Sequence, residues 1–159
     1  AFLHGSMFVT AHFHYTLMGA GLTGAIASLI YWFPKMTGKM INKRLSWIAF
    51  WLTQIGFNVA FMGMFFVGLQ GQPRRVEAYA AIFNQGNLIT TIGAYTIMIG
   101  MLILLHAVIS SWRSGVKAPM NPWQAKTLEW TVANPVPLEN FEVLPVVTSD
   151  AYGYGKASS

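Results

Sequence analysis

The chain contains no cysteine, and this absence removes several kinds of chemistry at once. Without thiols it can form no disulfide, hold no zinc ion or iron–sulfur cluster through thiolates, and use no thiol nucleophile. A metal bound by this chain is therefore expected to be held by imidazole.

Charge is also scarce. Charged residues make up 9% of the 159 residues, whereas soluble proteins have about 25%. Together with a hydrophobic content of 54%, this predicts a membrane protein in contact with lipid. The net charge of +5 does not indicate a nucleic-acid partner, because the basic residues flank apolar segments and act there as topology signals.

Three runs without Lys, Arg, Asp or Glu are long enough to cross a bilayer: residues 1–34, 45–73 and 78–112. We expect helices at about 6–33, 46–70 and 87–112. Residues 1–113 would then form a three-helix transmembrane segment, and the polar residues 114–159 a tail outside the membrane. The expected fold class is an all-α membrane protein.

The positive charges set the expected orientation. The first connection carries four basic residues and the tail begins with Arg113 and Lys117, whereas the second connection has only an Arg pair beside Glu77. By the positive-inside rule, the first connection and the C-terminal tail face the cytoplasm. The N-terminus, with His4, then lies outside.

The most informative pattern is a pair of histidines two residues apart, His12 and His14, inside the first charge-free run. A polar ring in a membrane helix needs a partner. Each residue of an α-helix turns by about 100°, so the two side chains point about 200° apart and cannot easily bind one ion. The pattern favours one helix serving two metal centres, with Phe13 between them. The alternative is a pair of structural histidines that hydrogen-bond within a helix bundle.

Two adjacent arginines, Arg74 and Arg75, follow Pro73 on the expected outer side, where positive charge is under-used. Such a pair needs an anion, and the planar guanidinium suits carboxylates well. Haem propionates, a lipid phosphate and a salt bridge with Glu77 all satisfy this need, so the sequence alone leaves the anion open.

Five motifs follow one another in a specific order: His4 with Ala11-His12-Phe13-His14-Tyr15, Tyr31-Trp32-Phe33-Pro34, Gly71-Gln72-Pro73-Arg74-Arg75, Asn121-Pro122-Trp123, and Thr127-Leu128-Glu129-Trp130. This order resembles the C-terminal part of subunit I of the haem–copper terminal oxidases, of the cytochrome c or quinol oxidase type. The resemblance covers nearly the whole chain. It implies that the three helices are the last three of a twelve-helix bundle.

The resemblance implies two haems, of the haem a type, held by one helix. His12 matches the axial ligand of the high-spin haem, whose iron faces a copper ion and binds oxygen. His14 matches an axial ligand of the low-spin haem, and Phe13 matches the ring on the electron route between the haems.

Further implied roles lie at the outer end of the helices. Arg74 and Arg75 match the pair that binds haem propionates, and His4 matches a histidine near the propionates and a non-redox metal such as magnesium. The usual Asp after that histidine is Gly5 here. Because hard cations prefer oxygen ligands, the missing carboxylate weakens the expected magnesium site.

The family's copper-ligating histidines, its cross-linked tyrosine and the second ligand of the low-spin haem lie upstream in the matching pattern, and none is in this chain. The chain also begins with Ala and lacks a charged region before the first apolar run, so we expect neither a signal peptide nor an intact translation start. We therefore expect an N-terminal part of subunit I as a partner, in a subunit that is split or cleaved.

The implied function is that of an oxidoreductase, active only in this complex, which reduces O2 to water and couples this to proton translocation. Subunits II and III, and cytochrome c or quinol as electron donor, are the further implied partners. The tail favours a bacterial plasma membrane over the mitochondrial inner membrane. The alternatives are a nitric oxide reductase core fragment and a two-haem membrane cytochrome without oxygen chemistry.

Overall fold

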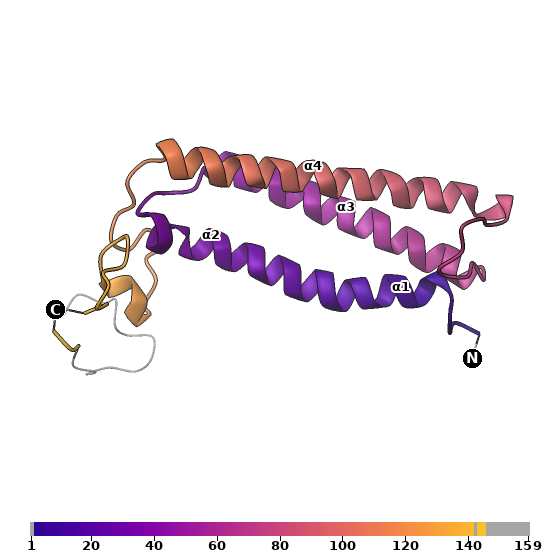
Figure 1. The fold of residues 1–159 in the computed structure, drawn as a ribbon, viewed down its shortest axis with the longest axis horizontal. Coiled ribbons are helices and arrows are strands. Elements are labelled where there is room, and N and C mark those ends of the chain that lie inside the picture. Colours follow the sequence, from indigo (N-terminus) through magenta and orange to yellow (C-terminus); the bar gives the residue numbers. More distant parts are fainter. Residues whose placement is uncertain (1, 142, 146–159) are drawn as a thin grey trace. The chain divides into compact units, whose positions relative to one another are not determined.

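The computed structural model describes residues 2–141 and 143–145, which are mainly helical and contain no β-strand (Figure 1). The elements are α1 (Met7–Phe13), the π-helix η1 (His14–Leu22), α2 (Thr23–Thr37), α3 (Lys43–Leu69), the 3-10 helix η2 (Ala81–Phe83), α4 (Asn84–Ser114) and the 3-10 helix η3 (Leu128–Thr131). Three helical stretches are long and apolar enough to cross a membrane: Met7–Thr37, Lys43–Leu69 and Ala81–Ser114. The predicted all-α fold with three apolar spans is confirmed.

The chain divides into two compact units. The first comprises Ala1–Ala27 and Lys43–His106, and the second comprises Ser28–Asn42 and Ala107–Ser159. The histidine pair and the arginine pair both belong to the first unit.

The first helical stretch changes its winding at His14. The α-helix ends at Phe13, and the wider π-helical turns run from His14 to Leu22. Phe13 and His14 themselves keep right-handed α dihedral angles, with φ of −70° and −69°. The α-helical turn per residue, which separates the directions of His12 and His14, therefore holds as far as His14, where the π-helix begins.

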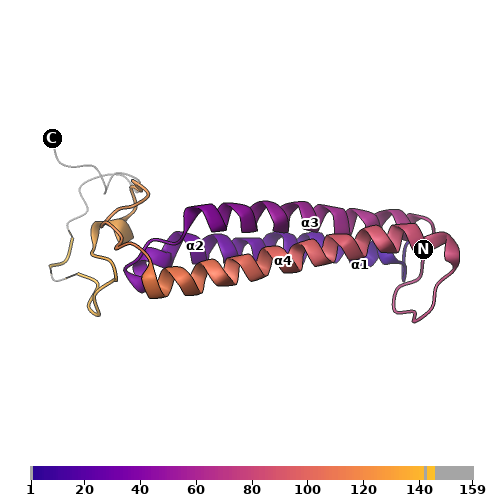
Figure 2. The ribbon, with the colours of Figure 1, turned by 90° about the horizontal axis from the view of Figure 1, so that it is seen from above.

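Within the first unit, α3 and α4 lie side by side (Figures 1 and 2). Their backbones approach closely at glycines, as in many membrane helix pairs. A Cβ atom added to Gly93 would lie 2.7 Å from the Cα atom of Ala60, and one added to Gly56 would lie 2.8 Å from the Gly93 carbonyl oxygen. A buried cluster of Phe57, Ala60, Phe61 and Ile97 fills the core of this unit.

The helices extend beyond the apolar runs from which their bounds were predicted. The first stretch continues through Pro34 to Thr37, four residues past the expected end at 33. Proline did not stop it, because the last turn is closed by the Gly38 N–H, which donates to the Pro34 carbonyl at 2.8 Å. Gly38 has a φ of +72°, so the stop comes from a glycine in the left-handed region. Likewise α3 begins at Lys43 rather than 46, because polar residues continue the helix before its charge-free run. α4 begins at Asn84 rather than 87, at polar residues inside the run 78–112.

In the second unit, the tail folds onto the C-terminal end of α2. The indole N–H of Trp130 donates to the Tyr31 hydroxyl at 2.7 Å, and that of Trp123 donates to the Tyr31 carbonyl at 2.9 Å. Trp130 is only 1% exposed. The aromatic motifs of the tail and the Tyr31–Pro34 motif are therefore parts of one packed structure.

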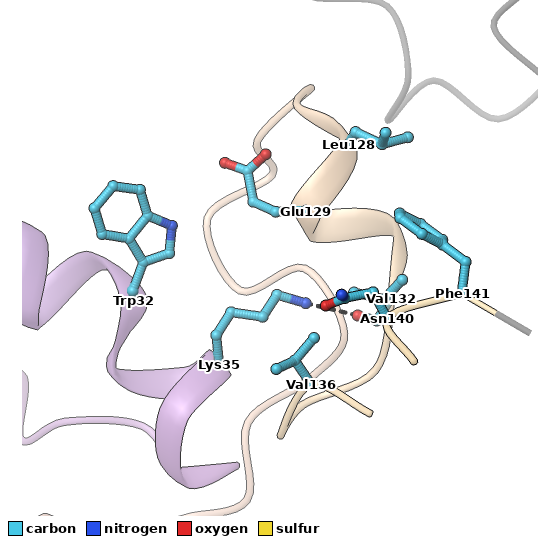
Figure 3. Close-up of a pocket in the computed structure, with 8 residues that line it drawn as sticks. All are labelled: Trp32, Lys35, Leu128, Glu129, Val132, Val136, Asn140 and Phe141. Carbon is cyan, nitrogen blue, oxygen red and sulfur yellow. Dashed lines mark hydrogen bonds between the residues drawn. The ribbon is translucent and has the colours of Figure 1, made fainter. Parts of the chain in front are cut away.

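Lys35 completes this contact. Its Nζ donates to the carbonyl oxygens of Val132 at 2.7 Å and Ala133 at 3.4 Å, and lies 4.9 Å from the centre of the Trp130 ring. A cavity of about 360 Å³ borders the lysine (Figure 3); its lining residues are Trp32, Lys35, Leu128, Glu129, Val132, Val136, Asn140 and Phe141. The buried ammonium thus holds the tail against α2.

Candidate functional site

His14 lies at the first position of η1, half-buried against α3. Its Nδ1 atom is 2.8 Å from the carbonyl oxygen of Thr10. Because a carbonyl oxygen only accepts hydrogen bonds, Nδ1 carries the proton and Nε2 keeps its lone pair. A nitrogen in this state can bind a metal ion.

Two phenyl rings stack on the His14 imidazole. The ring of Phe13 lies with its centre 4.4 Å away at an interplanar angle of 29°, and that of Phe61, from α3, lies 4.5 Å away at 17°. The hydrogen bond and these rings fix the position of the imidazole. Its Nε2 atom has no hydrogen-bonding partner in the described chain.

His12 has different surroundings on the same helix. It is exposed on α1, and no residue of the described chain hydrogen-bonds to its ring. Phe13, between the two histidines, is 38% exposed. Only 6% of the most apolar window of this helical stretch is buried. His12 itself is exposed, so its ring is open to groups outside the chain.

The donor set fits haem better than a chelated metal ion. Among the residues that the structure describes, no group of three or more His, Cys, Asp or Glu side chains could hold an ion. Haem iron needs only one or two protein ligands, because the porphyrin supplies the other four. One imidazole whose proton is held by a carbonyl, and a second on an exposed apolar helix, are suitable donors of this kind.

The aromatic residues of α3 form the other wall of the site. Phe57 and Phe61 are each 5% exposed, and Phe57 contacts the Tyr15 ring at 4.8 Å. The Tyr15 hydroxyl donates to Asn58 Oδ1 at 2.9 Å. The sequence pattern did not single out Phe57 and Phe61, so their stack beside His14 was missed. Their four-residue spacing, which places them on one face of α3, was the available indication.

The turn that carries His4 is joined to the loop that carries the arginines. The Arg74 N–H donates to the Gly5 carbonyl at 2.9 Å, and the Met7 N–H donates to the Gln72 carbonyl at 2.9 Å. Arg74 is half-buried, while Arg75 is exposed with a φ of +62°. The structure thus brings together the N-terminal turn and the Arg pair, which are about 70 residues apart in the chain.

Gln72 anchors this loop to α4. Its side chain is buried, and its amide exchanges hydrogen bonds of 2.9 and 3.3 Å with that of Asn87. Sequence reasoning did not single out either residue. In the described part of the chain, neither Arg74 nor Arg75 forms an ion pair with a carboxylate.

Comparison with known proteins extends this picture. The profile of the family described as Cytochrome C and Quinol oxidase polypeptide I matches residues 1–96. Among curated relatives, cytochrome c oxidase subunit 1 of Thermostichus vulcanus is 46% identical over 153 residues, that of Synechocystis sp. 42% over 153, and that of Bacillus sp. strain PS3 44% over 147.

These alignments cover 96%, 96% and 91% of this chain but only 28%, 28% and 24% of the respective relatives. The chain therefore spans about a quarter of their length. The profile match includes the histidine pair, the arginine loop and more than half of the sequence. The chain belongs to the cytochrome c and quinol oxidase polypeptide I family.

Proposed function

We propose that this chain is the C-terminal part of the catalytic subunit of a respiratory terminal oxidase, which reduces O2 to water and couples this to proton translocation. In this proposal, His12 is the axial ligand of a high-spin haem and His14 an axial ligand of a low-spin haem, both of the a type. The observation that carries it is the state of the two imidazoles. The His14 Nδ1 proton is held by the Thr10 carbonyl, and His12 has no hydrogen-bonding partner in the described chain.

Haem and copper, when bound, supply the redox chemistry of oxygen reduction. The chain's own contribution is to position the ligands. The Thr10 carbonyl fixes the tautomer and direction of the His14 ring. Phe13, between the two ligands in the sequence and stacked on His14, provides an aromatic ring on the short route between the two sites.

Arg74 and Arg75 are proposed to bind the haem propionates. The carboxylate of Glu77 does not pair with them, and a forked guanidinium matches a carboxylate closely. His4 lies in the turn that bonds to Arg74 and would contact a propionate or a water molecule there. A magnesium ion at this end would lack the carboxylate that Gly5 replaces.

The remaining parts of the oxidase are proposed to come from outside this chain. The copper ligands would belong to the N-terminal part of subunit I, which completes a bundle of twelve helices. Subunits II and III, and cytochrome c or quinol as donor, would complete the assembly. We propose a bacterial plasma membrane, with the N-terminus outside and the tail in the cytoplasm.

Spectra of the assembled oxidase test the two ligand assignments. His14→Ala should abolish the low-spin haem signal and leave a haem that binds carbon monoxide. His12→Ala should remove or strongly perturb the carbon-monoxide-binding haem and spare the low-spin spectrum. As a control, His106→Ala removes an imidazole from α4 and should leave both haems intact.

Loss of the same haem in both variants, or of neither, would contradict the proposal and support structural roles for the two histidines. Carbon monoxide also distinguishes the functional classes. A cytochrome whose two haems both have bis-imidazole ligation has no open coordination site. An unmodified complex that fails to bind carbon monoxide would therefore be an electron carrier rather than an oxidase.

A further inference from the structure

The His14 imidazole is fixed in direction by one hydrogen bond and in plane by its ring contacts. The bond from Nδ1 to the Thr10 carbonyl, 2.8 Å long, determines where Nε2 points. The ring plane can still tilt about the line of a single hydrogen bond. Phe61 limits this tilt, because its ring lies nearly parallel to the imidazole, at 17° and 4.5 Å.

Phe61 is itself held firmly. It is 5% exposed and belongs to the buried cluster at the centre of the first unit. The ring of Phe57 packs against it edge-on at 4.8 Å and 60°, and that of Tyr15 lies at 6.4 Å and 74°. Because close-packed rings in such a cluster cannot tilt freely, Phe61 presents a rigid flat surface to His14.

Phe13 provides a less rigid surface. It also stacks on His14, but its interplanar angle is 29° and its side chain is 38% exposed. It belongs to the same helix as His14, so it moves with that helix. The contact with Phe61 therefore fixes the orientation of the imidazole plane relative to α3.

We propose that Phe61 is a positioning residue that sets the plane of the His14 imidazole and thereby tunes the low-spin haem. This inference rests on the proposed function, because it requires His14 to be an axial ligand. Groups around a ligating histidine orient its ring and adjust its bond to the metal. The orientation of the axial imidazole plane sets the splitting of the iron d orbitals, which the g-values of a ferric low-spin haem report.

The experiment uses the assembled oxidase and electron paramagnetic resonance of the oxidised low-spin haem. Phe61→Leu keeps an apolar side chain but removes the flat ring, and should shift and broaden the largest g-value. Phe61→Tyr keeps the ring and should restore the signal of the unmodified oxidase. Phe57→Leu is the matched comparison: Phe57 is equally buried on α3 but reaches His14 only through the Phe61 ring, so its loss should shift the g-value less.

An unchanged g-value in Phe61→Leu would overturn the proposal, and so would equal shifts in Phe61→Leu and Phe57→Leu, since these would reflect general loosening of α3. If Phe61→Leu fails to assemble, Phe61→Met fills the space with a flexible chain that has no ring plane, and the same shift is expected. The His14→Ala variant distinguishes failure of the proposed function from failure of the inference about Phe61. If that variant retains the low-spin haem, the proposed function fails; if it loses the haem while Phe61 variants keep normal g-values, only the present inference fails.

Discussion

Gly68 of α3 is the position at which a single methyl group should most disturb the first unit. It faces the backbone at the start of α1. A Cβ atom there would overlap the backbone nitrogen of Phe8 and lie 2.7 Å from the Phe8 Cα atom, about 0.7 Å less than the 3.4 Å at which ordinary contact begins. Backbone cannot move aside by changing a rotamer, so Gly68→Ala must push α1 away from α3.

Two opposing terms set the size of the effect. Overpacking costs up to about 3 kcal/mol, and alanine favours a helix over glycine by about 1 kcal/mol. The expected net loss is therefore about 2 kcal/mol. Gly24→Ala is the matched control, because nothing lies within 4 Å of a Cβ atom at that position of α2. It should be neutral or stabilise the protein by up to about 1 kcal/mol.

Denaturant titration of the full subunit in mixed micelles, followed by circular dichroism, measures both variants. The low-spin haem spectrum should also shift in Gly68→Ala, since the start of α1 leads directly to His12 and His14. Equal stabilities for Gly68→Ala and Gly24→Ala would refute the close approach of α1 to α3.

Three other predictions concern the arginine loop, the N-terminal turn and the contact between Lys35 and the tail. Arg74→Ala and Arg75→Ala should each lower a haem midpoint potential in redox titrations, because a cation beside the propionates favours the reduced haem; unchanged potentials in both would assign the pair to a lipid phosphate. Manganese titration followed by electron paramagnetic resonance should find no tight site at His4, as Gly5 supplies no carboxylate, and a well-resolved signal would show that other ligands compensate. Lys35→Met leaves two carbonyls without their donor, at a cost of about 1–3 kcal/mol. Chymotryptic cleavage within residues 128–141 should then be faster by roughly tenfold or more, and an unchanged rate would mean that Lys35 does not hold the tail.

The three helices could be predicted from sequence because absence of charge over a bilayer's width is a strong constraint in itself. The helix ends could not be placed as well, since they depend on local hydrogen bonds. Pro34 looked like a stop and was not one, whereas Gly38 ends the helix through a left-handed conformation that only the structure reveals.

The features of the candidate site that depend on residues close together in the chain could be predicted from the sequence. Its contacts between distant segments could not. His12 and His14 are two residues apart, so helical geometry alone separates them. The partners of His14 and of the arginine loop come from distant segments: Phe61 lies 47 residues after His14, and Asn87 lies 15 residues after Gln72. No periodicity in one sequence specifies which face of α3 meets which side of the first helix.

These tertiary contacts make the two histidines unequal. On one side of the helix, α3 and the Thr10 carbonyl constrain His14 before any ligand binds, whereas the chain leaves His12 exposed. In the proposed assignment, this difference suits the two haems. An electron-transfer haem benefits from a ligand held rigidly in one orientation, because reorganisation on reduction is then small. A haem that binds oxygen must have a second metal beside it. In the proposed assignment, the part of the subunit that carries the copper ligands therefore completes the pocket around the His12 haem.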